Sequence, residues 1–596
     1  MKSKMIAALI AMTLSLGAAG CSAKNTTSAT GAQILSSIAV SAGDVETVGT
    51  AGTFIELGDT VQVNGTGATV ENKKVTITAA GTYSISGTVT DGQIIVAAGE
   101  NDKVYIILNG VNISSSSSSP VYVKSCDKAV VSMAAGTNNY IKDTSAAAEA
   151  EPDAAIFSKD DLIITGTGSL SLESANNDGI AGNDDLKIQN GNISITAAGD
   201  GIKGKDTVVI TDGNIVVNSK EDGIKATNDT DVEKGYVLIT GGKLNVTAGE
   251  DGIQGEVNTF VKSGDITIKS GGGSANSSTK ENWGQWGPQK QDSATSTDTE
   301  EDTASAKAIK AGVNIVIEGG TFNIDSSDDA FHSNNNLVIS NGTFNISSGD
   351  DGLHSDSTLT INKGTINIAK AYEGIESQTI TINDGTVNLT SSDDGLNASG
   401  GADSSSTSGR QGQNSFASSD SGMINLNGGN ITVNAEGDGI DSNGSIKMTG
   451  GNVTVNGPVS NGNGALDYNG TFDLTGGILT AAGSSGMAQA PSTSSTQNSV
   501  KINLTQQAAN TPVYITDSSG SVIVTVTPAK DYASVVISSP KLVKGSTYNV
   551  YVGENKKTLA GSFTVSGSVS EVTQAGASAS NGGGPGSHGT RKAPTQ

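Results

Sequence analysis

The sequence is poor in cysteine, proline, aromatic residues and positive charge, and these shortages exclude several classes of protein. It has 2 Cys, 10 Pro and 4% aromatic residues in 596 residues. Its 78 Gly follow no G-X-Y period and come with little proline, so the chain is not collagen-like. The 35 basic residues against 60 acidic ones give a net charge of −25. Nucleic acid is excluded as a partner because binding it requires a basic surface. Bound cations, or basic patches on an acidic body, are the expected chemistry.

Hydrophobic residues make up 35% of the chain, which is low, but Val, Ile and Leu occur in short alternating runs. This alternation is typical of β-strands and argues against disorder through most of the length. Many thin, similar layers fit this composition better than one large core.

The N-terminus reads as an export signal. Lys2 and Lys4 precede an apolar stretch, and small residues follow it up to Cys21. The stretch is too short to span a membrane. The small residues before Cys21 resemble the lipobox of bacterial lipoproteins, with Ala18 where that pattern usually has Leu. We therefore expect residues 1–21 to be a lipoprotein signal with Cys21 lipidated, which places the protein outside the cell on a lipid anchor. Plain secretion is the alternative. Cys126 is then left without a partner and is read as a small buried side chain.

Two short strings recur through the middle of the chain. One is an acidic-Gly-aliphatic corner such as Asp200-Gly201-Ile202, and the other is a strand opener such as Gly320-Thr321-Phe322-Asn323-Ile324. Many successive corners are 22 residues apart. A unit this short cannot fold alone and must stack on its neighbours, with equivalent strands paired in parallel. We expect an all-β fold, a parallel β-helix that is right-handed by the usual crossover preference. Propellers and sandwiches are disfavoured because their units are longer.

The regularity of the repeat and the composition change along the chain. We expect a flexible linker at 22–35, irregular β-helix turns and a cap at 36–175, and a regular β-helix at 176–490. A small antiparallel β cap is expected at 500–570 and a disordered tail at 571–596. Inserts fall at 228–235, 271–307 and 399–420. All three flank the same Asp-Gly corner, and because solenoids tolerate insertions on one face, often the binding face, we place function there.

Each corner taken alone is explained as a turn, with Asp bonded to nearby amides and Gly accepting positive φ. Stacked at about 4.8 Å, however, unpaired carboxylates repel each other and need cations. Oxygen-only clusters suit Ca²⁺ rather than Zn²⁺. The expected ligands are the corner acids and the acids that precede them: Asp222, Asp251, Asp328, Asp329, Asp350, Asp351, Glu373, Asp393 and Asp394.

A second column lies three residues after each corner acid and runs from basic to acidic along the chain. Its Lys203, Lys225 and Lys310 are candidates for binding carboxylated sugars, with a solvated polar column as the alternative. His332 and His354 of the same column fall on adjacent turns and are also candidate substrate-binding residues; as a pair they are expected to stack rather than to bind zinc. The two tryptophans, Trp283 and Trp286, are candidates for packing onto sugar rings or for anchoring the insert that contains them.

At this point the chain resembles a known family. Segments 81–87, 91–96 and 108–113 resemble the N-terminal signature of bacterial extracellular carbohydrate-binding β-helix proteins. The corner and opener repeats resemble the central repeats of that family, and segment 539–548 resembles its C-terminal segment. The resemblance implies a pectate-lyase-like fold, calcium held by acidic turn residues, and binding to plant cell-wall polysaccharide, particularly polygalacturonate, without established catalysis.

Three functions are compatible with these patterns. The first is a lipid-anchored, calcium-dependent and non-catalytic polysaccharide-binding protein, acting as a monomer. The second is a pectate-lyase-like enzyme, in which Ca²⁺ acidifies a proton and Lys203, Lys225 or Lys310 acts as base. The third is a structural surface protein or adhesin, since alternating Thr and Asn ladders suit a protein ligand as well as a sugar.

Overall fold

The computed structural model describes residues 42–43, 45–146, 151–277, 306–399 and 421–577. The expected lipidation site Cys21, the two tryptophans Trp283 and Trp286, and most of the inserts at 271–307 and 399–420 lie outside these ranges. The described chain is almost entirely strand, with two short 3₁₀ turns, η1 (Ser274–Asn276) and η3 (Glu554–Lys556). None of its helices is long and apolar enough to cross a membrane.

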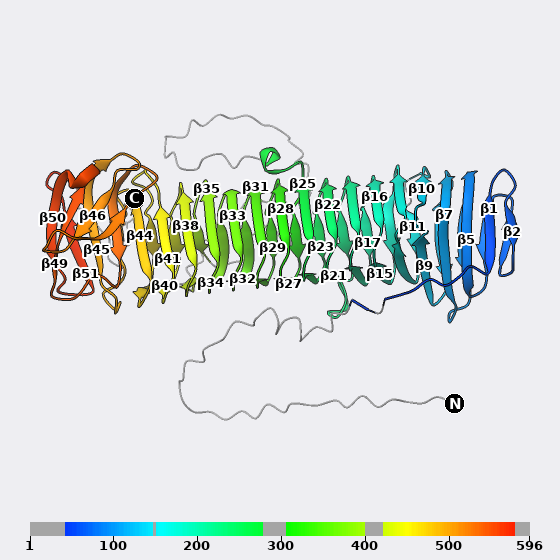
Figure 1. Ribbon diagram of the computed structural model, residues 1–596, viewed down its shortest axis with the longest axis horizontal. Helices are drawn as coiled ribbons and strands as arrows, with labels where there is room; N and C mark the ends of the chain where they lie inside the picture. Colours follow the sequence, from blue (N-terminus) through cyan, green and yellow to red (C-terminus); the bar gives the residue numbers. More distant parts are fainter. Residues whose placement is uncertain (1–41, 44, 147–150, 278–305, 400–420, 578–596) are drawn as a thin grey trace, which may run out of the picture.

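The chain winds into a long coil in which each turn contributes three strands, so the predicted parallel β-helix is confirmed (Figure 1). Equivalent strands of successive turns pair in parallel and in register: Ile193 lies opposite Ile215, and Ile215 opposite Leu244. The 22-residue period is the length of one turn, since Asn192 and Asn214 are register partners. The three strands of a turn define three sheets, which we call the short-strand sheet, the middle sheet and the long-strand sheet.

The short-strand sheet comprises β4 (Lys74–Ile77), β6 (Gln93–Ala97), β8 (Val121–Ser125), β11 (Ala154–Ser158), β14 (Asp178–Gly182), β17 (Ile202–Gly204), β20 (Ile224–Ala226), β23 (Ile253–Gly255), β26 (Ile309–Ala311), β29 (Phe331–Ser333), the first parts of β32 (Leu353–Ile361) and β34 (Ile375–Ile382), β36 (Leu396–Ala398), β39 (Ile440–Ser442) and β42 (Leu466–Tyr468). The middle sheet comprises the first part of β7 (Lys103–Ser115), β9 (Lys128–Met133), β12 (Asp161–Gly166), β15 (Asp185–Ile188), β18 (Thr207–Ile210), β21 (Tyr236–Ile239), β24 (Asn258–Val261), β27 (Asn314–Ile317), β30 (Asn336–Ile339), the second parts of β32 and β34, β37 (Met423–Leu426), β40 (Ser445–Met448) and β43 (Phe472–Leu474).

The long-strand sheet comprises the end of β7, β10 (Asn138–Asp143), β13 (Ser169–Ser174), β16 (Asn192–Ala197), β19 (Asn214–Ser219), β22 (Lys243–Ala248), β25 (Asp265–Ser270), β28 (Thr321–Ser326), β31 (Thr343–Ser348), β33 (Thr365–Lys370), β35 (Thr386–Ser391), β38 (Asn430–Ala435), β41 (Asn452–Asn456) and β44 (Ile478–Gly483). At the N-terminal end the coil opens with β1 (Thr53–Leu57), β2 (Gln62–Asn64), β3 (Ala68–Glu71) and β5 (Gly81–Thr90). Two antiparallel pairs, β1 with β2 and β3 with β4, distinguish this end from the regular turns.

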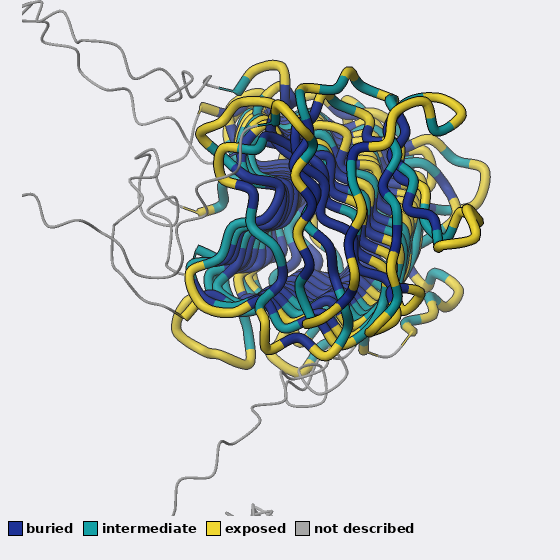
Figure 2. Tube along the Cα trace, turned by 90° about the vertical axis from the view of Figure 1, so that its left-hand side faces the viewer, coloured by how far each residue is buried: buried dark blue, intermediate teal, exposed yellow. Residues whose placement is uncertain are grey.

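The core is a continuous column of aliphatic side chains that runs the length of the coil. Seen down the axis, buried positions line the inside and exposed residues gather in the turns (Figure 2). In β16, for example, Ile193 and Ile195 are buried, while Ser194 between them is exposed. Identical residues stack where the register repeats, as with Phe322 and Phe344, whose ring centroids are 4.7 Å apart with an interplanar angle of 2°. The low hydrophobic content is therefore sufficient because each turn buries only a few side chains.

The C-terminal cap is largely antiparallel, as predicted. A sheet of four strands has the order β47-β46-β49-β50, and β48 pairs antiparallel with both β44 and β45. The bounds of these strands are β45 (Ser499–Gln507), β46 (Val513–Thr516), β47 (Val522–Val526), β48 (Tyr532–Ser538), β49 (Thr547–Val552) and β50 (Thr558–Thr564). The expected end of the cap at residue 570 is too early, because β51 (Val569–Thr573) pairs in parallel with β45.

Candidate functional site

The corner repeat lies at the start of the short strands. The inserts at 228–235 and 399–420 follow short strands β20 and β36, and the insert at 271–307 precedes short strand β26. The inserts therefore border the short-strand sheet at both ends of its strands, rather than all lying at one corner. This sheet is the part of the coil that carries the acidic residues singled out in the sequence.

The corner glycines are required by close packing between turns. A Cβ added to Gly201 would lie 2.2 Å from Cγ1 of Val217 and 2.6 Å from the carbonyl oxygen of Gly223. Gly201 does not have a positive φ, so the expectation that corner glycines supply left-handed backbone is wrong. That role belongs to the strand-opener glycines, such as Gly213 with φ of 124°.

The corner acids form a hydrogen-bonded column along the coil. In all of these acids except Glu373, one carboxylate oxygen accepts the backbone N–H of the corner residue in the next turn: Asp222 N–H donates to Asp200 Oδ1 at 3.0 Å, and Asp251 N–H donates to Asp222 Oδ1 at 2.8 Å. We call this the corner column. Its members are Asp178, Asp200, Asp222, Asp251, Lys307, Asp329, Asp351, Glu373, Asp394 and Asp438. Each of these bonds holds one oxygen of the accepting acid and leaves the other oxygen for a second partner.

The second column faces these remaining oxygens. We call it the partner column, and strand register gives its members as Ala181, Lys203, Lys225, Gln254, Lys310, His332, His354, Glu376, Asn397, Asp441 and Asp467. In the N-terminal turns it supplies cations. Lys203 Nζ lies 3.1 Å from Asp178 Oδ2 and 3.4 Å from Asp200 Oδ2. Lys225 pairs with Asp222 at 2.5 Å, and Lys310 with Asp251 at 3.2 Å.

These pairs revise two expectations. The prediction that the stacked carboxylates lack partners is wrong for Asp222 and Asp251, because lysines of the same chain neutralise them. The three lysines are likewise engaged by acids rather than presented to a ligand. Burial acts to lower the pKa of Lys203, but the charges of Asp178 and Asp200 outweigh it, so the net pKa is raised and the ammonium is fixed. Burial also raises the pKa of Asp222 to about 7, with the charge of Asp251 adding to it.

Lys307 occupies a position in the corner column where other turns carry an acid. Its backbone N–H bonds Asp251 Oδ1 at 2.8 Å, as a corner acid's would. Its side chain is 1% exposed, and Nζ lies 2.7 Å from Asp328 Oδ2 and 3.6 Å from Asp329 Oδ2. Asp328, Asp329 and Asp350, all expected calcium ligands, bring carboxylate oxygens within 4.8 Å of one another. An ammonium already lies against two of these three acids.

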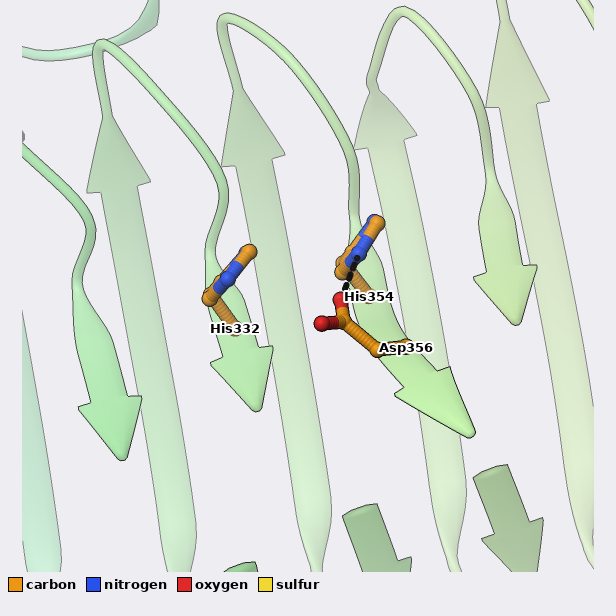
Figure 3. A group of neighbouring side chains, drawn as sticks. All are labelled: His332, His354 and Asp356. Atoms are coloured by element: carbon orange, nitrogen blue, oxygen red, sulfur yellow. Dashed lines mark hydrogen bonds and ion pairs between the residues drawn. The ribbon is translucent and has the colours of Figure 1, made fainter. Parts of the chain in front are cut away.

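The two histidines stack as predicted. Their ring centroids are 4.7 Å apart with an interplanar angle of 6°, and Figure 3 shows the rings side by side on adjacent strands. His332 Nδ1 lies 2.8 Å from Asp329 Oδ2, and His354 Nδ1 lies 3.2 Å from Asp351 Oδ2. The rings thus continue the pairing of corner acids with partner-column groups. Parallel rings direct their nitrogen lone pairs side by side rather than toward one point, which does not suit a tetrahedral metal.

His354 is surrounded by carboxylates at both nitrogens. Nδ1 also lies 3.1 Å from Glu376 Oε2, and Nε2 lies 3.1 Å from Asp356 Oδ1. Two nitrogens that both face carboxylates must both donate, so the ring is an imidazolium. Burial acts to lower the pKa of His354, but these three acids raise it well above its usual range. In return, His354 overcomes the burial of Glu376 and lowers the pKa of that carboxyl to about 2.

Beyond His354 the partner column supplies no cation. Within the described residues, no Lys, Arg or His forms an ion pair with Glu373, Asp394, Asp438 or Asp441. Burial raises the pKa of both Asp438 and Asp441 to about 7, and neighbouring acids contribute. Burial and the charges of Asp393, Asp438 and Asp441 raise the pKa of Asp394 well above its usual value. The C-terminal half of the columns is therefore an acidic tract, which we define as Glu373, Asp393, Asp394, Asp438, Asp441 and Asp467.

Asn397 lies in this tract with one amide atom unsatisfied. Strand register places it between Glu376 and Asp441, and its side chain is 5% exposed. Its Nδ2 donates to Glu373 Oε2 at 2.8 Å, while its buried Oδ1 has no hydrogen-bond partner among the described residues. A buried amide oxygen without a donor is costly and calls for an explanation such as an ion or a water. Sequence reasoning placed Asn397 in the partner column but not among the ligands.

The columns thus divide into a self-neutralised N-terminal half and an acidic C-terminal half. The expected sites in the N-terminal half have internal counterions, whereas those at Glu373, Asp393 and Asp394 have none in the described chain. The sequence contains a sign of the internal counterion at Lys307. When Lys307-Ala308-Ile309-Lys310 is aligned with Asp222-Gly223-Ile224-Lys225, a lysine stands at the position of the corner acid.

The chain is similar to known proteins that are described as carbohydrate-binding or polysaccharide lyase-like. A curated relative from Acetivibrio thermocellus, described as a carbohydrate-binding domain-containing protein, is 36% identical over 202 residues, which are 33% of this chain and 65% of the relative. The chain therefore spans just under two thirds of that relative. A solved structure of the polysaccharide lyase-like protein from C. thermocellum, a gadolinium derivative, is 36% identical and matches 37% of this chain and 92% of its own, with a TM-score of 0.36. The family profile described as carbohydrate-binding domain-containing protein matches residues 71–352 and 351–531, which is well over half of the sequence. The chain belongs to this carbohydrate-binding domain-containing protein family.

Proposed function

We propose that the protein is a cell-surface, calcium-dependent and non-catalytic receptor for acidic polysaccharide of the polygalacturonate type. Membership of the carbohydrate-binding domain-containing family supports a polysaccharide as the partner. The observation that carries the calcium part is the acidic tract, whose half-buried carboxylates have no internal counterion in the described chain. The lipid anchor at Cys21 and the monomeric state are parts of the same proposal.

The acidic tract fits a calcium ion by its donor set. Its groups offer only oxygen atoms, which is the preference of Ca²⁺. Asp394, Asp438 and Asp441 would supply carboxylates from successive turns; the described chain does not bring the three within 4.8 Å of one another, so an ion would have to draw them together. Asn397 Oδ1, which has no hydrogen-bond partner among the described residues, would supply a neutral oxygen. Bound calcium would offset the repulsion among these acids and would offer remaining coordination positions to the carboxylates of a uronate chain.

The described residues beside the tract include no basic side chain, and this favours binding over catalysis. A lyase needs a basic side chain that is unprotonated at the working pH and lies close to the cation. In the described chain, the partner column beside the tract carries Glu376, Asn397 and Asp441. The expected candidate bases Lys203 and Lys225 lie in other turns, where acids raise the pKa of both and hold them protonated.

The test measures retention and product together. The purified protein is incubated with insoluble polygalacturonate, with and without Ca²⁺, and both pull-down and the ultraviolet absorbance of unsaturated products are recorded. Retention that requires Ca²⁺, without new absorbance, is the expected result. Rising absorbance would establish a lyase instead, and absence of retention in both conditions would favour the surface-protein alternative.

Matched variants locate the site. The triple variant Asp394→Asn, Asp438→Asn and Asp441→Asn keeps the shape of the acids and removes their charge, so calcium-dependent retention should be lost. The control is Asp265→Asn, because Asp265 is half exposed and pairs with Lys243 on the long-strand sheet. If the triple variant still binds as the native chain does, the tract is not the calcium site.

A further inference from the structure

The middle sheet carries a second apolar row on its outer surface, which the proposed function does not use. In β18, Val208 and Ile210 belong to the main core, whereas Val209 between them belongs to a separate cluster. Because side chains alternate along a strand, Val209 points away from the core. Register repeats this position in the following turns. The row, which we call the middle-sheet stripe, consists of Val209, Leu238, Phe260, Val316 and Val338.

The stripe is buried although it faces outward. None of its five side chains is more than 5% exposed, and Leu238, Phe260 and Val316 are at 0%. The neighbouring insert at 228–235 does not cover it with an apolar side chain, since Val232, its single aliphatic residue, is 77% exposed. An outward apolar row of this length requires a covering element.

The described part of the N-terminal segment lies on this same surface. Ala42 packs against the stripe. Four residues later, Glu46 N–H donates to Gln189 Oε1 at 2.9 Å and Gln189 Nε2 donates to Glu46 O at 3.0 Å, next to β15. The Glu46 carboxylate reaches Lys128 of β9 at 3.5 Å. In Figure 1 this dark-blue segment follows the edge of the coil below β15 and β9. The chain thus runs along the middle sheet, from the stripe toward the first turns.

The residues that precede Ala42 match the stripe in composition and length. They read Ile34-Leu35-Ser36-Ser37-Ile38-Ala39-Val40-Ser41, and they lie outside the described ranges. Eight extended residues span about 26 Å. Four steps from Val209 to Val338, at about 4.8 Å each, span about 19 Å. Following the direction set by Glu46 and Ala42 backward, these residues would meet the stripe from Val209 onward.

We propose that residues 34–41 bind the middle-sheet stripe as an intramolecular strap. The strap places Ile34, Leu35, Ile38 and Val40 where they can cover the apolar row. For a chain anchored at Cys21, only residues 22–33 would then remain between the lipid and the strap. Twelve residues have a root-mean-square span of about 20 Å, so the coil would be held by its middle sheet rather than by its end. The short-strand sheet with the acidic tract would stay available to ligand.

Disulfide trapping tests the strap directly. In the full chain with Cys21→Ser, the double variant Ile38→Cys and Val316→Cys should form an internal disulfide on mild oxidation, since disulfides require Cα atoms within about 7 Å. The control joins Ile38→Cys with Asn323→Cys, which lies one strand later and is exposed on the long-strand sheet. A tethered segment has an effective concentration of about millimolar, roughly a thousandfold above micromolar protein, so the product should be monomeric. Equal yields in the two variants, or disulfide-linked dimers, would overturn the proposal.

Hydrogen exchange tests it without new cysteines. Replacing Ile34, Leu35, Ile38 and Val40 by Ser should speed amide exchange in β21, β24 and β27 and leave β31 and β33 unchanged. The control variant, Ser36→Ala with Ser37→Ala, changes the same segment without removing its apolar residues. Unchanged exchange in the middle sheet, or a change that appears in both variants, would contradict the strap. Because neither experiment involves polysaccharide or calcium, its outcome is separate from that of the proposed function.

Discussion

Replacing Lys307 by Met is the sharpest test of how the corner column is stabilised. The substitution keeps the length of the side chain and removes the ammonium that lies 2.7 Å from Asp328 Oδ2 and 3.6 Å from Asp329 Oδ2. At an effective dielectric constant of about 20, these contacts correspond to about 6 and 5 kcal/mol of attraction. Burying the ammonium offsets most of this. Since buried ion pairs that lose one partner typically cost about 3–5 kcal/mol, we expect a loss of that size.

The measurement should resolve single turns, because repeat proteins unfold in parts. Urea denaturation at neutral pH gives the overall loss, and hydrogen exchange in β26 and β29 gives the local one. Lowering the pH should shrink the loss, since the carboxyls of Asp328 and Asp329 become protonated and no longer need a counterion. Added Ca²⁺ should recover part of it, as these two acids and Asp350 have oxygens within 4.8 Å of one another.

The control is Lys243→Met, whose side chain is 67% exposed and pairs with an exposed acid. Surface pairs contribute about 0–1 kcal/mol, so this variant should unfold almost as the native chain does. If Lys307→Met were no more destabilised than Lys243→Met, the claim that an internal ammonium neutralises the column would be refuted.

Three further results are expected. Burial raises the pKa of Asp438 and Asp441 to about 7, so between their usual pKa and pH 7 the folded chain binds more protons than the unfolded chain. Without divalent ions, the free energy of unfolding should therefore fall as pH rises through about 7. A profile that is flat with pH, with or without calcium, would contradict this. Burial raises the pKa of Cys126 to about 12, so a thiol reagent should label it only on unfolding, and rapid labelling of the native chain would show that the first turns open. Phe344→Ala should cost about 3–5 kcal/mol in urea denaturation by removing one ring of the core stack, whereas Phe54→Ala, at a residue that is 53% exposed, should have little effect.

The fold could be predicted because its information is local and repeated. The spacing of corners fixed the length of a turn, and alternation within each unit identified the inward residues, such as Ile193 and Ile195. The cap was recognisable because its strands break that period. Its end at Thr573 was missed because β51 closes the sheet through contacts with β45, which lies 68 to 70 residues earlier in the chain.

The two columns were predicted from the sequence spacing, but the ion pairs between them were not. Sequence spacing put the acids and the lysines into two columns, yet it did not reveal that a side chain three residues along would turn back onto its own corner, as Lys225 does onto Asp222. Lys307 was overlooked because the insert before it disrupts the period. The middle-sheet stripe was also missed, since Val209 lies in an unbroken apolar run whose outward member cannot be told from its inward ones without a partner segment.

Because equivalent strands of successive turns pair in the same register, the number of turns in the coil can change without changing how each turn packs. In the regular part of the coil, the strands of each turn pair only with strands of the turns before and after it. A whole turn could therefore be duplicated or removed without disturbing the others, and the outcome would be a shift of the lysine-bearing half against the acidic half. In such a coil, evolution can change the order of charged turns by duplicating or deleting units while the β-helix architecture stays the same.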